Sequence, residues 1–130
     1  MLIAIPISNK KFISKLSQSF GRSDFFLFYE TETHTKKILY NPYKGTVGGA
    51  GIQSAQLMIE KKVNVVITYQ IGLNALKILS SADIKTFLCT SGNCETAISL
   101  FLDNKLEPCT CNVFNQNRIQ RTRFRKGRQN

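Results

Sequence analysis

The stretch Thr46-Val47-Gly48-Gly49-Ala50-Gly51-Ile52-Gln53-Ser54-Ala55-Gln56-Leu57-Met58 runs from a glycine-rich turn directly into a helical pattern. The spacing of three and four that is typical of one helix face is followed by Ile52, Ala55, Gln56, Ile59 and Val63. Glycines before a helix leave its start with little side-chain cover. The first amides of a helix have no intrahelical partners and lie at the positive end of its dipole. The stretch therefore predicts either an anion-binding helix start or a tight loop that lets the helix pack on a sheet.

Strands and helices alternate on both sides of this stretch. Strands are expected at residues 2–7, 25–30, 36–40, 63–68 and 84–89, and helices at residues 51–62, 72–81 and 94–104. The second and third strands lie close enough in sequence to predict a hairpin. Connections that contain a helix favour parallel strands with right-handed crossovers. The pattern predicts an α/β fold, a three-layer sandwich around a mixed five-stranded sheet.

A ligand-binding edge follows from this topology. If the first, third, fourth and fifth strands run parallel, their carboxyl ends open on one edge of the sheet. Residues 8–9, 48–51, 69–72 and 89–94 then meet there. Open α/β sheets bind ligands at this edge, so we expect the four segments to form one site.

Charge and composition limit the classes of function. The 130 residues, 42% of them hydrophobic, suffice for one domain, and neither a membrane span nor a signal peptide is recognisable, so a cytoplasmic location is expected. The net charge of +10 comes largely from Arg118, Arg121, Arg123, Arg125, Lys126 and Arg128. Residues 1–117 keep eleven Lys and one Arg against eight acidic residues, a net charge of +4. The basic character therefore belongs to the C-terminal segment. We expect the chain to consist of a domain at residues 1–107 and a flexible basic tail at residues 108–130.

Catalytic and zinc-binding motifs are missing from the sequence. The cysteines at 89, 94, 109 and 111 do not form a Cys-x-x-Cys pair, and no Gly-Lys-Ser/Thr follows the glycines. The single His34 has no partners for a serine–histidine–acid set. The first strand contains no carboxylate that would hold a nuclease metal. We therefore expect a protein without enzymatic activity.

The motifs together resemble a known family. The residues that carry the resemblance are Ile3-Ala4-Ile5-Pro6, Phe20-Gly21-Arg22, Asn41-Pro42, Gly48-Gly49-Ala50-Gly51-Ile52-Gln53 and Ile71-Gly72-Leu73-Asn74-Ala75. Over residues 1–107 the chain resembles the dinitrogenase iron-molybdenum cofactor biosynthesis family, which includes NifX, NifY and the C-terminal domain of NifB. The resemblance implies a ribonuclease-H-like motif with sheet order 3-2-1-4-5 and an antiparallel second strand. It also implies a carrier of an iron–sulfur or molybdenum-containing cluster.

The resemblance assigns candidate binding residues. A large anionic cluster would be bound at the glycine edge, through Gly48, Gly49, Gly51, Ile71 and Gly72. Arg22 fits an anionic ligand or a salt bridge to Asp24 or to a neighbouring loop, and Asn74 fits a ligand contact or a residue that caps or braces the second helix. Many family members carry histidine before Phe-Gly-Arg, whereas this chain has Ser19, a poor ligand for iron or molybdenum.

The cysteines are the alternative metal ligands. Cys94 lies at a helix start, where the dipole favours a thiolate, but it also fits an incidental first-turn residue. Cys89 fits either a ligand or a small buried hydrophobic residue. Cys109 and Cys111 fit a shared soft metal or a surface pair without a role.

Three functions remain open from the sequence. The first is a carrier of a metallocluster or inorganic anion that passes its cargo to an apo-target protein. The second is a nucleic-acid-associated protein that binds through its basic tail. The third is a scaffolding domain that binds a partner and no cluster.

Overall fold

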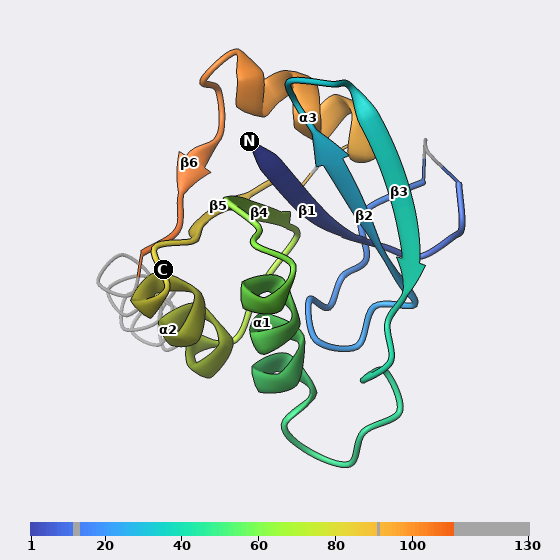
Figure 1. Ribbon diagram of the computed structural model, residues 1–130, viewed down its shortest axis with the longest axis vertical. Coiled ribbons are helices and arrows are strands. Elements are labelled where there is room, and N and C mark those ends of the chain that lie inside the picture. The colour runs from blue at the N-terminus through green and yellow to red at the C-terminus, as the bar shows by residue number, and fades with distance from the viewer. Residues whose placement is uncertain (12–13, 91, 111–130) are drawn as a thin grey trace, which may run out of the picture.

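A mixed sheet forms the centre of the protein. The computed structural model describes residues 1–11, 14–90 and 92–110. In these residues the strand order is β3-β2-β1-β4-β5-β6, and three helices cover the sheet (Figure 1). The strands are β1 (Leu2–Ile7), β2 (Phe25–Glu30), β3 (Thr35–Tyr40), β4 (Val65–Thr68), β5 (Lys85–Leu88) and β6 (Glu107–Pro108). The helices are α1 (Ala50–Glu60), α2 (Leu73–Ser81) and α3 (Cys94–Leu102).

The strand directions agree with the predicted mixed α/β sheet. β2 pairs antiparallel with β1 and with β3, whereas β4 pairs parallel with β1 and with β5. The prediction of five strands is wrong, because β6 adds an antiparallel partner to β5 at the end of the order. β6 is two residues long and contains Pro108, so it has no periodicity that a sequence pattern would reveal.

Two hydrophobic cores lie on opposite faces of the sheet. Figure 1 shows α1 and α2 on one face and α3 on the other, so the layers are those of a three-layer sandwich. Along β1, Ala4 packs in the core under α1 and α2, and Ile3 and Ile5 pack in the core under α3. A strand covered on both faces is a continuous apolar run, which is why β1 was recognisable.

The buried face of α1 differs from the predicted one. Its buried residues are Ala50, Ser54, Ala55 and Met58. Gln56 and Ile59, predicted to belong to this face, are exposed, Ile59 by 40%. The helix contacts α2, and its Ala55 and Met58 belong to the same hydrophobic core as Ala4 of the sheet.

The end of the described chain corrects the expectation for Cys109. Its side chain is buried in the core with α1 and α2, and its N–H donates to the carbonyl oxygen of Thr86 at 2.7 Å, so a surface position is wrong. Cys111 and the basic segment 118–128 lie outside the described residues, and the boundary at 107 stays a prediction. None of the helices in the described ranges is long and apolar enough to cross a membrane.

Candidate functional site

A cavity of about 720 Å³ lies where the carboxyl end of β4 meets the first turns of α1 and α2. Three segments line it: residues 19–22, residues 49–52 and residues 70–75. The lining contains the cation Arg22 and neither Asp nor Glu. The cavity therefore has a positive electrostatic bias before any ligand enters.

Two helices start at this cavity without side-chain caps. The residue before α1 is Gly49, in the left-handed region at φ 71°, and the residue before α2 is Gly72; neither helix has a capping side chain or an acidic residue in its first turn. The first intrahelical bonds run from Gln53 N–H to the Gly49 carbonyl and from Leu76 N–H to the Gly72 carbonyl, both at 3.0 Å.

Six backbone amides are consequently left over at the cavity. They belong to residues 50–52 and 73–75, all of which line it, and they have no protein acceptor within the described part of the chain. Each helix start adds the positive end of its dipole. Unpaired amides at two adjacent helix ends are a ready-made arrangement of donors for an anion.

Arg22 also lines the cavity. Its side chain is exposed, and its Nη1 donates to the carbonyl oxygen of Lys44 at 3.0 Å. The Lys44 ammonium pairs with the Asp24 carboxylate, and this hydrogen bond raises the pKa of Lys44. Of the expected alternatives, the salt bridge to Asp24 is wrong, because Asp24 pairs with Lys44, whereas Arg22 does contact the neighbouring loop through the Lys44 carbonyl oxygen. The contact to Lys44 uses one of the five guanidinium N–H groups of Arg22.

The predicted binding residues mostly lie around this cavity. Those in its lining are Arg22, Gly49, Gly51, Ile71, Gly72 and Asn74. Gly48 precedes them and is not part of the lining, and neither are residues 8–9. Asn74 is exposed in the first turn of α2, where Gly72 holds the capping position, so the expected capping role is wrong. Ser19 also lines the cavity, and its Oγ accepts the Arg22 N–H at 3.1 Å.

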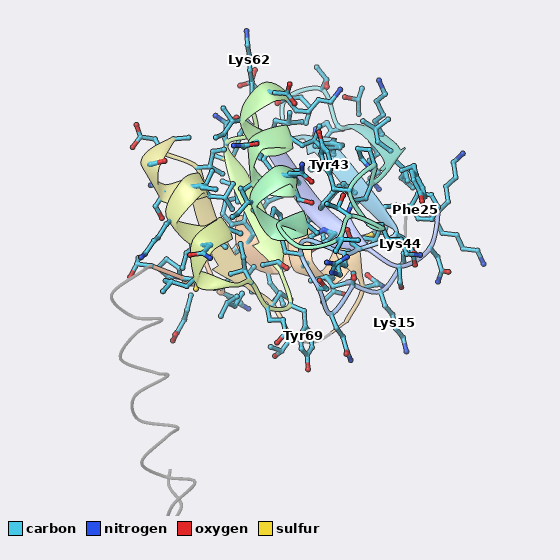
Figure 2. All side chains as sticks on the ribbon, turned by 90° about the horizontal axis from the view of Figure 1, so that it is seen from below. Lys15, Phe25, Tyr43, Lys44, Lys62 and Tyr69 are labelled. Atoms are coloured by element: carbon cyan, nitrogen blue, oxygen red, sulfur yellow. The ribbon has the colours of Figure 1, made fainter. Side chains whose placement is uncertain are left out.

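A second cavity shows that the predicted edge is divided in two. Its volume is about 480 Å³, and its lining includes Lys15, Tyr69, Cys89 and Asn93. Tyr69 lies in this cavity, whereas the next residue, Gln70, lies in the first one. Figure 2 shows Tyr69 and Lys15 at the same end of the molecule, opposite Lys62. Cys89, Thr90, Gly92 and Asn93 thus line the second cavity and not the glycine site.

The two cysteines proposed as metal ligands are both buried. Cys89 lines the second cavity with 3% of its surface exposed, and Cys94 is fully buried at the start of α3 and lines neither cavity. Burial raises the pKa of the Cys94 thiol, which acts against a thiolate at this helix start. Among the described residues no three His, Cys, Asp or Glu side chains gather as metal ligands. Ligation by Cys89 or Cys94 stays a prediction.

Sequence reasoning missed the contacts behind the cavity wall. Asn41 is fully buried and bonds to the carbonyl oxygens of Gly21 and Ser23. Gly21 and Asn41 were part of the motifs that carried the resemblance, but nothing in their local pattern assigned them a role. The signal was present in the glycine between Phe20 and Arg22, because a glycine between two larger residues often marks a close backbone approach.

These features define a small α/β domain with an anion-receptive cavity between two helix starts. Residues 1–104 match the family described as dinitrogenase iron-molybdenum cofactor, and the chain belongs to this family. An uncharacterized protein of Methanocaldococcus jannaschii is 33% identical over 110 residues, which cover 82% of this chain and 90% of that protein.

Solved structures agree with the fold. The apo form of the orange protein from Desulfovibrio gigas has a TM-score of 0.79 at 24% identity, covering 83% of this chain and 92% of that one. A candidate NifB protein from Thermotoga has a TM-score of 0.73 at 29% identity, covering 82% of this chain and 91% of that one. The nucleic-acid alternative gains no support from these relatives.

Proposed function

We propose that this protein is a non-enzymatic carrier that holds an anionic iron–sulfur or molybdenum-containing cluster, or its precursor, in the cavity between α1 and α2. The cluster is cargo that is passed to an apo-target protein during metallocluster assembly. Arg22, Gly49, Gly51, Ile71, Gly72 and Asn74 surround it. We also propose that the sheet and helices form a ribonuclease-H-like motif and that the protein acts in the cytoplasm.

One observation carries the proposal: the cavity has no acidic residue in its lining, which contains Arg22 and six residues whose amides have no protein acceptor in the described part of the chain. Such clusters are usually anionic, and backbone donors bind them without a fixed set of covalent ligands. This mode of holding suits a carrier, because cargo that is not ligated by several side chains can be released. Family membership makes a metallocluster the first ligand to test.

Metal and sulfide analysis of protein prepared without oxygen tests the proposal. Protein is incubated with iron and sulfide, or with tetrathiomolybdate, and separated from unbound metal on a desalting column. We expect stoichiometric uptake in at least one of the two incubations. Retention of neither metal nor sulfide would overturn the carrier function.

Charge variants locate the uptake. Arg22→Gln removes the cation of the cavity and should weaken tetrathiomolybdate binding about tenfold, as expected for a charge-assisted contact. Lys62→Asn is the matched control, since it removes a cation at the other end of α1, and asparagine tolerates the left-handed φ of 59° there. Cys89→Ala and Cys94→Ala test the thiols. A loss confined to these cysteine variants would move the site to the α3 side.

A further inference from the structure

A buried polar cluster lies behind the cavity wall that carries Arg22. Its centre is Asn41, which is fully buried. The Asn41 Nδ2 donates to the carbonyl oxygens of Gly21 and Ser23, both at 3.0 Å, and its Oδ1 accepts the Tyr43 N–H at 2.9 Å. Ser54 of α1, also fully buried, donates its hydroxyl to the same Gly21 carbonyl at 3.1 Å. The cluster thus joins residues 21–23, the chain after β3 and the first helix.

The joined segments touch backbone to backbone. A Cβ on Gly21 would lie 2.6 Å from both the Cα and the N of Gly51, which is closer than real Cβ contacts permit. Gly51 carries one of the open amides, and Arg22 directly follows Gly21. The distance between the cation and the amides of α1 is therefore set at this contact. Asn41 holds the contact without contributing an atom to the cavity lining.

We infer that Asn41 is a positioning residue of the binding site. It holds Arg22 in one place relative to the amides of α1, so an anion meets both at once. The inference rests on the proposed function for its ligand. Asparagine suits this position because it offers two donors to two carbonyls and an acceptor to an amide. Three hydrogen bonds from the buried Asn41 side chain restrain these segments, and a preorganised site loses less entropy when its ligand binds.

Titration calorimetry, which measures the affinity of the full chain for tetrathiomolybdate, tests the inference. Asn41→Ala should weaken binding at least tenfold. Arg22→Gln should cost about tenfold in the wild type and threefold or less in the Asn41→Ala background, because Arg22 is then no longer held in place. A purely structural role would lower the amount of folded protein but leave the Arg22 effect equal in both backgrounds.

Asn64→Ala is the matched control. Asn64 is also a side-chain amide that fastens backbone, since its Oδ1 accepts the Leu2 N–H at 2.8 Å, but it lies at the amino ends of β1 and β4. It should bind tetrathiomolybdate as the wild type does. Ser54→Ala is the second variant should Asn41→Ala fail to fold, and a threefold loss of affinity is expected. Wild-type affinity in the Asn41 or Ser54 variant, or an undiminished Arg22 effect, would overturn the inference.

Hydrogen exchange separates this inference from the proposed function. The Arg22 N–H, which donates to Ser19 Oγ, should exchange at least tenfold faster in ligand-free Asn41→Ala and unchanged in Asn64→Ala. Unchanged exchange in Asn41→Ala contradicts the positioning role. A wild type that takes up neither tetrathiomolybdate nor iron and sulfide overturns the proposed function, while the exchange rates still decide the role of Asn41.

Discussion

The two faces of the sheet begin their helices in different ways. On one face α1 and α2 start at glycines, without caps and without acidic residues in their first turns. On the other face α3 starts at Asn93, whose Oδ1 accepts the Thr96 N–H at 3.0 Å, and Glu95 follows in its first turn. The Cys94 N–H of α3 also has an acceptor, the Ser14 carbonyl oxygen at 2.9 Å, so the start of α3 has protein acceptors and a negative charge near its dipole. The first amides and the dipoles of α1 and α2 have no such partners in the described part of the chain, so a ligand in the cavity can supply them.

This difference has an energetic side. An N-cap contributes about 1 kcal/mol to the stability of a helix, so two uncapped starts forgo stabilisation that the third one has. Features that are locally unfavourable for folding concentrate at functional sites. The uncapped starts of α1 and α2 meet at the larger of these two cavities, which Arg22 also lines. The capped start of α3 borders the smaller one. The comparison supports a ligand on the α1 and α2 side.

The largest effect on stability is expected from a substitution at Gly21, in the wall of the cavity between α1 and α2. Gly21→Ala places a methyl group against the backbone of Gly51 and should lower the free energy of unfolding by about 2 kcal/mol or more, the range of overpacked cores. Gly51→Ala is the control, since its Cβ meets only the Ala75 side chain at 3.5 Å and should change stability by less than about 1 kcal/mol. Urea unfolding measures both. Equal stability of the two variants would contradict the close approach of residues 21 and 51.

The second prediction gives α2 the kind of start that α3 already has. At Gly72 the backbone is extended and nothing lies within 4 Å of an added Cβ, so Gly72→Asp fits and can cap the helix. Stability should rise by a few tenths to about 1 kcal/mol. Tetrathiomolybdate affinity should fall at least tenfold, about 1.4 kcal/mol, because a carboxylate then occupies the amides. Gly72→Ser caps without charge and should lose less affinity; unchanged affinity in both would exclude α2 from the site.

The third prediction removes the N-cap of α3, the helix on the other face of the sheet. Asn93→Ala removes the cap of α3 and should lower stability by about 1 kcal/mol, measured as a drop in Tm of several degrees. Tetrathiomolybdate binding at the first cavity should not change, since Asn93 lines only the second cavity of the two. A loss of affinity as large as that of Gly72→Asp would mean that both helix ends serve one ligand.

The sequence predicted most of the fold because burial on two faces leaves a pattern. β1 and β4 are apolar runs. The glycines before α1 predicted either an open helix start or a tight loop. β6 has two residues and a proline, so no pattern exists for it. The role of Asn41 was unreadable because its partners Gly21 and Ser23 lie 20 and 18 positions away and are backbone carbonyls, which any residue provides. The division of the edge into two cavities was not predicted, because residues 69 and 70 line different cavities and the sequence does not show on which side of the sheet each residue lies.

The smallest effect concerns Cys94, which also lies at a helix start but on the α3 side of the sheet. Because burial raises its pKa, the folded protein keeps the thiol proton at pH values where the unfolded chain, with a pKa of about 8.5, has lost it. The stability contributed by the neutral thiol is complete below that pH and falls as the pH rises toward the folded pKa, by at most about 1.4 kcal/mol per pH unit.

Urea unfolding between about pH 7 and pH 10 measures this dependence. Cys94→Ala lowers stability at every pH because it leaves a cavity, but its decline with rising pH should be shallower than that of the wild type. Equal slopes would show that the thiol titrates as it does in water. A shallower slope would mean that the dipole of α3 does not offset the loss of water around Cys94. A helix start then favours an anion only where unpaired amides reach it, which is the arrangement we propose for the cavity between α1 and α2.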